Sequence, residues 1–281
     1  MFKPQKALHL HIEEDKKKPK FVDRAYAIYE KYDGWYGYFD SEDGVIKSRA
    51  GREIPSVAHL NERLRQHVQK GVLIFEILLD DVTLFKDLNG VLNRKAPAPT
   101  AYLKVHDFYD KTLPQAGLSK RTAMMYEIVE AINSSRVRPA PILGVSSNPE
   151  TWKAKADLIM QAGGEGIILK AIDAPISQDK RNADLMKIKM EVTLDLLVVS
   201  LVRGDGKYAG TLGALRCVDR DGSVHMISGM SDAQRAEWWN TPSLIVNHVV
   251  EVQAMCQLPN GSLREPRFKA VRYDKAPKDI D

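Results

Sequence analysis

The stretch that decides the fold reads AYAIYEKYDGWYGYFD and occupies residues 25–40. Its two halves, AYAIYEK and WYGYFD, are rich in the aromatic and β-branched residues that favour strands. Asp33-Gly34 stands between them as a turn signal. We therefore predict two successive strands, with Lys31 at the end of the first. The turn puts the lysine amine at the rim of a sheet, over whatever lies in the neighbouring cleft.

Further strands and helices are predicted on the C-terminal side of this stretch. GVIKSR (44–49) continues the strands, and residues 57–68 then place apolar side chains at helical spacing. VLIFEILLD (72–80) is almost continuously apolar, which is typical of a strand buried on both faces. Strands are also predicted at 102–108, 166–170 and 185–189, and helices at 122–133 and 150–162.

The character of the sequence changes after about residue 190. Short strands now alternate with glycine-bearing turns, and one short helix near 232–239 interrupts them. Five strands and one helix within about 90 residues fit a small closed barrel of the oligonucleotide-binding (OB) type. We place the domain boundary near Lys189–Glu191, which gives domains 1–190 and 191–281. The five strands are predicted at 194–202, 212–218, 224–229, 248–256 and 268–273.

Composition bounds the class of protein without identifying it. Hydrophobic residues make up 44% of the 281 residues and charged residues 28%, which is a globular balance. We see no apolar run near the ~20 residues that span a bilayer and no secretory signal, so we expect a cytoplasmic protein. Cys217 and Cys256 make no CxxC pair, which argues against a structural zinc.

The positive charge is mild overall but concentrated in two places. The net charge of +4 does not by itself predict binding to nucleic acid. However, residues 16–20 read Lys-Lys-Lys-Pro-Lys, and Arg264 to Lys275 contains five basic and two acidic residues. On charge alone, these segments are explained by a solvated tail and a charged strand face.

Three short motifs follow one another along the first domain. The first is Lys31-Tyr32-Asp33-Gly34, and the second is Glu165-Gly166, where Gly166 lets the backbone approach a ligand before a strand begins. In the third, Lys187 and Lys189 are two apart in a strand and so share a face. Taken singly, the motifs can be a hairpin end, a glycine-rich turn and an edge strand protected by lysines.

Taken in this order, the segments resemble the covalent nucleotidyltransferase superfamily of ATP-dependent DNA ligases, RNA ligases and mRNA capping enzymes. The small bacteriophage and bacterial ATP-dependent DNA ligases look most similar, through the segment 208–215 and the final Arg-x-Pro-x-Phe…Arg-x-Asp-Lys at 264–275. The resemblance covers about residues 25–275. It implies an α+β fold: a nucleotidyltransferase (ATP-grasp-like ligase) domain of antiparallel sheets with flanking helices, followed by a C-terminal OB-fold β-barrel.

The resemblance also implies an activity. The expected enzyme is an ATP-dependent DNA ligase that seals 5′-phosphate/3′-hydroxyl nicks in duplex DNA through a covalent lysyl-AMP on Lys31 and a DNA-adenylate. The expected cofactors are ATP and Mg²⁺, with Mn²⁺ as an alternative metal. ATP is favoured over NAD because the chain lacks the four-cysteine zinc module of the NAD-dependent ligases. We expect nicked double-stranded DNA as the partner, no membrane, no obligatory protein partner and a monomer.

For nucleotide binding, the resemblance implies that Lys31 is the nucleophile. Lys187 and Lys189 match the lysines on the α-phosphate, Glu76 matches a carboxylate on the ribose, and Glu165 matches a metal-associated carboxylate. Glu76 is a second candidate for the metal. The other residues expected at the nucleotide are Tyr29, Glu30, Arg49, Phe108, Lys170, Arg264 and Lys275, with Phe108 as the ring that stacks on the purine.

The roles carried over for DNA rest on arginines. Arg49 and Arg181 match arginines that touch phosphate at the nick, and Arg94, Lys95 and the run at 16–20 are secondary candidates. DNA contact through phosphates should be independent of sequence and sensitive to salt. One position departs from the family: Tyr36 stands two residues after Gly34, where an arginine is usual. The sequence leaves open whether Arg49 or another residue compensates.

The chemistry explains why cations should surround Lys31. A free lysine has a pKa of ~10.4, so only about 0.1% is neutral at pH 7.5. Nearby like charges and a metal disfavour the ammonium form and stabilise the charge that builds on the α-phosphate. In the first step the barrel is expected to close over the cleft, with the basic C-terminal motif on the pyrophosphate.

Two other functions stay open at this point. An RNA ligase or a capping guanylyltransferase would use the same Lys31 and the same pair of lysines. A non-catalytic nucleic-acid-binding protein is suggested by the barrel alone, although such a protein would not require the three motifs of the first domain.

Overall fold

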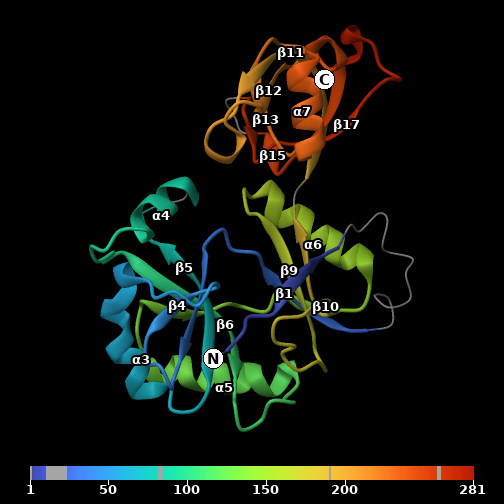
Figure 1. Cartoon of the computed structure of the whole chain (residues 1–281). Coiled ribbons are helices and arrows are strands. Elements are labelled where there is room, and N and C mark those ends of the chain that lie inside the picture. The colour runs from blue at the N-terminus through green and yellow to red at the C-terminus, as the bar shows by residue number, and fades with distance from the viewer. Residues whose placement is uncertain (1, 11–23, 82–84, 190, 258–260) are drawn as a thin grey trace. The chain divides into compact units, whose positions relative to one another are not determined.

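The structure is a computed structural model and describes residues 2–10, 24–81, 85–189, 191–257 and 261–281 (Figure 1). The chain divides into two compact units, Met1–Lys189 and Met190–Asp281. The predicted basic run at 16–20 lies outside the described residues. Within those residues, no helix has both the length and the apolar character needed to cross a membrane.

The first sheet of the first unit carries all three motifs. Its strands have the order β1-β10-β9-β2-β8. Lys31 directly follows β2, the glutamate-glycine turn leads into β9, and the paired lysines lie on β10. The strands β10, β9, β2 and β8 pair antiparallel, while β1 pairs parallel with β10. The bounds are β1 Lys6–His9, β2 Tyr26–Glu30, β8 Gly144–Ser146, β9 Gly166–Ala171 and β10 Arg181–Lys189.

The second sheet of the first unit is built around the apolar strand predicted at 72–80. Its order is β4-β3-β5-β6-β7, so β5 is central and is buried on both faces as its sequence indicates. Gly44 adopts a positive φ of 67° in the turn between β3 and β4. The bounds are β3 Trp35–Asp40, β4 Ile46–Ser48, β5 Val72–Leu79, β6 Ala101–Tyr109 and β7 Val137–Pro139.

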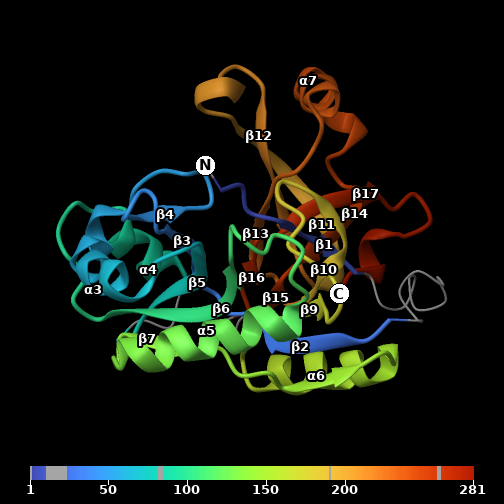
Figure 2. The same cartoon turned by 90° about the horizontal axis from the view of Figure 1, so that it is seen from below.

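Helices cover the outer faces of these sheets. Figure 2 shows α5 (Leu118–Ile132) along β6 and α6 (Pro149–Gln161) along β2. Trp152 of α6 is fully buried and meets Tyr26 edge to face, with ring centroids 5.3 Å apart. The helix predicted at 57–68 begins as a 3-10 turn and continues as an α-helix. The remaining bounds are η1 Pro55–Leu60, α3 Asn61–His67 and α4 Phe85–Leu92.

The second unit is a five-stranded sheet that closes on itself. The order is β13-β12-β11-β14-β17, and all these pairs are antiparallel. Closure comes from a parallel bridge between Ser228 and Arg267, where Phe268 N donates to Ser228 O at 2.7 Å. The bounds are β11 Val192–Arg203, β12 Leu212–Val218, β13 Val224–Ile227, β14 Val249–Ala254 and β17 Arg267–Val271.

One helix and one small hairpin complete this barrel. The helix α7 (Asp232–Asn240) connects β13 to β14 and starts with a capping box between Ser231 and Gln234. Trp238 of α7 meets Phe268 edge to face, with ring centroids 5.4 Å apart, and so joins the barrel core. The hairpin consists of β15 Cys256–Gln257 and β16 Leu263–Arg264. This closed barrel with a helix between its third and fourth strands confirms the predicted OB fold, and the α+β class is confirmed with it.

Candidate active site

A cavity of about 470 Å³ lies in the first unit and is lined from both of its sheets. Phe2 and Gln5, which precede β1, also line it, together with Lys6 and Ala7 of β1. Polar and charged side chains from β2, β5, β9 and β10 therefore meet at one cavity. The predicted site residues that line it are Tyr29, Glu30, Lys31, Arg49, Glu76, Lys170, Arg181 and Lys187.

Lys31 lies against the glutamate-glycine turn, as its sequence position at the end of β2 predicts. Its backbone N–H donates to Gly166 O at 2.9 Å, and its Nζ forms an ion pair with Glu165. The two side chains are only 20% and 10% exposed. Gly166 has a φ of 130°, and a Cβ there would lie 2.2 Å from Ile188 O. Only glycine therefore allows the turn to approach β10 so closely.

The paired lysines approach the same turn from the next strand. Lys189 pairs with Gly166 and Lys187 pairs with Ile168 across the β9–β10 ladder. Lys187 lines the cavity, and burial lowers its pKa, with Lys189, Lys31 and Arg181 adding to the effect. The cluster is thus a place where several positive charges disfavour one another and where an anion would relieve the repulsion.

Glu76 lines the cavity with a carboxylate oxygen that accepts no hydrogen bond from the described residues. Its Oε2 is completely buried and has no hydrogen-bond partner among the described residues. Burial raises the pKa of Glu76 to about 7, although Lys31 and Arg49 act in the opposite direction. A buried carboxylate oxygen without a partner is costly unless a ligand hydroxyl or a cation completes it.

The donor set fits a magnesium ion that is held jointly with a phosphate ligand. Mg²⁺ is commonly bound through one or two carboxylates plus substrate phosphates and waters. Glu76 and Glu165 supply two carboxylates beside Lys31. The residues described here contain no group of three or more His, Cys, Asp and Glu side chains that could hold a metal by themselves.

A buried ion cluster supports the floor of the cavity. Asp107 accepts hydrogen bonds from Lys170 Nζ at 2.9 Å and from Arg121 Nε at 2.9 Å. Burial tends to raise the pKa of Asp107, but Lys170 and Arg121 together hold it below its ordinary value. Arg121 Nη1 also donates to Ala116 O and Ala174 O, both at 2.7 Å. The cluster joins β6, β9 and α5 and so fixes the side of the cavity that Lys170 lines.

His106 lines the cavity beside this cluster. Burial, followed by the charge of Lys170, lowers its pKa to about 3, so the imidazole is neutral near pH 7. Lys170 Nζ lies 3.2 Å from His106 Nδ1 and has only donors, so Nδ1 accepts. The ring proton therefore resides on Nε2, which leaves one donor on a flat, uncharged ring at the cavity wall.

The prediction that Phe108 stacks on a base is wrong, because Phe108 belongs to the core. It is 3% exposed and packs in the apolar cluster beneath the second sheet. The register shifts between Ile74, which pairs with Asp107, and Phe75, which pairs with Val105. His106 is the extra residue of this bulge. Each residue after it therefore points to the opposite face of the sheet from the one that strict alternation predicts, which turns Phe108 into the core. Two adjacent polar residues, His106 and Asp107, in an otherwise alternating strand were the sequence signal for it.

Tyr36 and Arg49 both line the cavity and contact each other. Arg49 Cζ lies 3.9 Å from the centroid of the Tyr36 ring, and Arg49 Nη1 donates to Gln5 O at 3.3 Å. Tyr36 pairs with Glu76 across the β3–β5 ladder. The guanidinium of Arg49 therefore lies over the ring of Tyr36.

The remaining predicted residues lie elsewhere in the chain. Arg94 and Lys95 are exposed just after α4, and Lys189 is half-buried at the end of β10. Arg264 on β16 and Lys275 belong to the second unit. The lining residues that sequence reasoning missed include Phe2, Gln5, His106, Asp107 and Arg121.

Comparisons with known proteins agree with this architecture. Residues 203–272 match the family model of the DNA ligase OB-like domain. The chain is 31% identical over 179 residues to a probable DNA ligase of Anaeromyxobacter sp. (strain K), covering 54% of this chain and 34% of that protein. It is 29% identical over 215 residues to a probable DNA ligase of Streptomyces coelicolor, covering 67% and 41%. The chain thus spans between a third and two fifths of the length of these relatives.

Solved structures share the fold over nearly the whole chain. A structure from a study of Lig E DNA ligases, described as binding DNA with a minimal scaffold, has a TM-score of 0.75 at 18% identity and covers 97% of this chain and 100% of that one. Pmar-Lig_PreS3 has a TM-score of 0.74 at 21% identity and covers 96% and 68%. The ATP-dependent DNA ligase of bacteriophage T7, in complex with ATP, has a TM-score of 0.54 at 16% identity and covers 96% and 98%.

Proposed function

We propose that this chain is an ATP-dependent DNA ligase that seals 5′-phosphate/3′-hydroxyl nicks through AMP bound covalently to Lys31. The observation that carries the proposal is the meeting of three motifs around Lys31, at the edge of one cavity. Lys31 contacts Glu165, while Lys187 and the unpartnered Glu76 line the same space. The similarity to DNA ligases and the OB-type barrel support duplex DNA as the substrate.

The first step transfers AMP to the protein. Nζ of Lys31 attacks the α-phosphorus of ATP, a P–N bond forms, the bond to the pyrophosphate oxygen breaks, and Nζ gives up its proton to the Glu165 carboxylate. Glu165 orients the Lys31 amine by accepting a hydrogen bond from Nζ. Lys187 adds positive charge at the α-phosphate, where negative charge builds in the transition state. Magnesium, when bound at Glu76 and Glu165, would add charge stabilisation on the phosphates.

The nucleotide itself is bound by the cavity walls. His106 takes the role predicted for Phe108, since its neutral ring lies at the wall that Lys170 supports. Glu76 offers its free oxygen to a ribose hydroxyl or to the metal. Arg49, held over Tyr36, offers a guanidinium to phosphate. Arg272 and Lys275 of the final motif are proposed to bind the pyrophosphate.

The later steps use the same phosphate group twice. The 5′-phosphate oxygen of the nick attacks the phosphorus of lysyl-AMP, which frees Lys31 and makes a DNA-adenylate. The 3′-hydroxyl then attacks the 5′-phosphorus, a phosphodiester forms, and AMP leaves. Arg49 and Arg181, both at the cavity, are the proposed contacts to the 5′-phosphate.

Label transfer tests the proposal. Incubation with α-labelled ATP should give an acid-labile, hydroxylamine-sensitive label on the protein, and addition of nicked duplex should release it as AMP with sealing of the nick. Lys31→Ala should abolish the label, while Lys120→Ala, at an exposed lysine of α5, should leave it unchanged. No label on the wild-type protein, or full label on Lys31→Ala, would falsify the proposal. Preference for GTP or for RNA ends would instead indicate a capping enzyme or an RNA ligase.

A further inference from the structure

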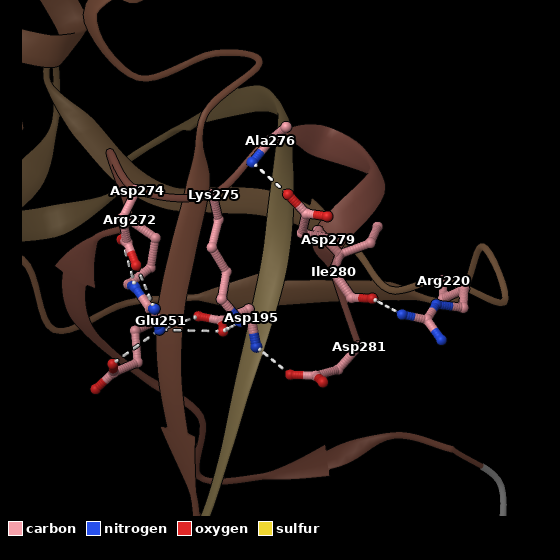
Figure 3. A network of polar contacts seen from close by, with 10 residues as sticks. All are labelled: Asp195, Arg220, Glu251, Arg272, Asp274, Lys275, Ala276, Asp279, Ile280 and Asp281. Carbon is pink, nitrogen blue, oxygen red and sulfur yellow. Dashed lines mark hydrogen bonds and ion pairs between the residues drawn. The ribbon is translucent and has the colours of Figure 1, made fainter.

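The second unit gathers two basic side chains around one buried carboxylate (Figure 3). Asp195 lies on β11, and its side chain is 8% exposed. Its two oxygens accept hydrogen bonds from Arg272 Nη1 at 3.2 and 3.1 Å, and Lys275 Nζ donates to the same carboxylate. Arg272 and Lys275 follow directly after β17. One aspartate of the first barrel strand thus holds both cations that follow the last strand.

The backbone that carries this carboxylate is itself fixed. Asp195 N donates to Asp281 Oδ2 at 2.7 Å, and Asp281 N donates back to Asp195 O at 3.0 Å. Arg220 N donates to Asp281 O at 2.6 Å, and Arg220 Nη2 donates to Ile280 O at 2.8 Å (Figure 3). Asp195 therefore cannot shift along β11 without breaking several hydrogen bonds at once.

The other carboxylates around Arg272 are more exposed. Asp274 accepts hydrogen bonds from Arg272 Nε at 2.9 Å and Nη2 at 2.7 Å, but its side chain is 66% exposed. Glu251 lies 3.6 Å from Arg272 Nη1 and is 31% exposed. The Nε–Nη2 edge is the one a phosphate can occupy through two parallel hydrogen bonds. A phosphate can displace the exposed Asp274, whereas the buried Asp195 stays.

The charge balance explains why a buried anion is useful here. Arg272 and Lys275 carry like charges and contact the same carboxylate, so without it they would repel each other. Because Asp195 lies between them, the two cations can keep their positions before a phosphate binds. A site that is organised in advance binds its ligand with a smaller loss of side-chain entropy.

We propose that Asp195 is a positioning residue that holds Arg272 and Lys275 as a preformed pair for the pyrophosphate end of ATP. The inference rests on the proposed function. A triphosphate takes part only in the step that transfers AMP to Lys31. A nick that already carries AMP offers no pyrophosphate to the pair. Asp195 should therefore serve the loading step and not the sealing of a pre-adenylated nick.

The test measures these two steps separately on the full chain. Asp195→Asn keeps the shape of the side chain and removes its charge. Loading of Lys31 from α-labelled ATP should slow by at least about tenfold, while sealing of a synthetic pre-adenylated nick stays within about twofold of the wild type. The matched control is Asp219→Asn, since Asp219 is a buried carboxylate of the same unit that bonds to His225 instead, at 2.9 Å. Both steps should stay within about twofold in this control.

A double-mutant cycle shows whether Asp195 acts through the pair. In a Lys275→Met background, Asp195→Asn should slow loading less than it does in the wild type, because one of the two side chains that it positions is gone. Equal slowing of both steps by Asp195→Asn, or an undiminished effect in the Lys275→Met background, would indicate a merely structural role and overturn the inference.

The remaining outcomes are also decisive. If Asp195→Asn does not fold, Lys275→Met alone decides: selective loss of loading supports the pair, and equal loss of both steps contradicts it. A wild-type protein that takes no label refutes the proposed function, and the inference falls with it. A wild-type protein that loads and seals, together with an unaffected Asp195→Asn, refutes only the role of Asp195.

Discussion

Replacing Glu76 by glutamine should make the folded protein more stable at alkaline pH and less able to load AMP on Lys31. The carboxylate has a completely buried oxygen without a partner in the described chain, and burial raises its pKa from 4.5 to about 7. Ionised Glu76 therefore destabilises the folded state. A ligand in the cavity is what would relieve it.

The sign and size of the stability effect follow from this pKa. Because the folded-state pKa lies above the unfolded value, the protonated group stabilises the fold below about pH 4.5, and this contribution is lost as the pH rises through about 7. Each unit by which the pKa of Glu76 is raised corresponds to about 1.4 kcal/mol. Ionising Glu76 in the folded protein therefore costs about 3 kcal/mol above pH 7. Glutamine avoids that cost but buries an amide at about 1 kcal/mol. The expected net gain near pH 8.5 is about 2 kcal/mol.

Urea unfolding at pH values from about 5 to 8.5 measures this directly. The wild-type protein should lose stability relative to Glu76→Gln across that range, while Glu127→Gln, at an exposed glutamate of α5, should track the wild type. In parallel, Glu76→Gln should load AMP on Lys31 at least about tenfold more slowly, because the ligand loses its carboxylate partner. The same pH dependence in wild type and Glu76→Gln would refute the reasoning.

Three further perturbations test other parts of the site. Asp107→Asn should cost about 3–5 kcal/mol in urea unfolding, since it leaves two buried cations without their anion, whereas Asp157→Asn in an exposed helix pair should cost less than about 0.5 kcal/mol. Gly166→Ala should lower the thermal midpoint because its Cβ would lie 2.2 Å from a β10 carbonyl, and Gly90→Ala, with open space around it, should not lower it. Lys187→Met should reduce loading of α-labelled AMP by at least about tenfold at unchanged thermal stability, and an unchanged loading rate would exclude Lys187 from the phosphate.

Much of the site was predictable because its residues lie at the ends of strands with strong local signals. The turn at Asp33-Gly34 puts Lys31 at a strand end, and alternation puts Lys187 on a defined face of β10. The apolar run of β5 indicates burial on both faces, which is where Glu76 acquires its raised pKa. These are short-range patterns of periodicity and turn chemistry, and they hold whatever the strand pairs with.

The residues that were missed depend on long-range pairing. Phe108 turns into the core only because a bulge at His106 shifts the register between β6 and β5. Arg121 is 14 residues from Asp107 in the sequence, on a different element, and becomes its partner only when α5 packs against β6. Gln5 contacts Arg49 because β1 joins the edge of β10 in parallel. No local pattern encodes these neighbours.

The sequence by itself therefore determined where most strands and helices lie, because local periodicity sets them. Its ordered motifs, through the resemblance that they carry, indicated the class of fold and the lysine proposed to react. The tertiary structure alone decided which ring lies at the cavity wall, how Arg49 covers the ring of Tyr36, and which carboxylate holds Arg272 and Lys275. The physical reason is that burial and charge act through space. A side chain's pKa, its partner and the face it presents are set by groups that only the folded chain brings within a few ångströms.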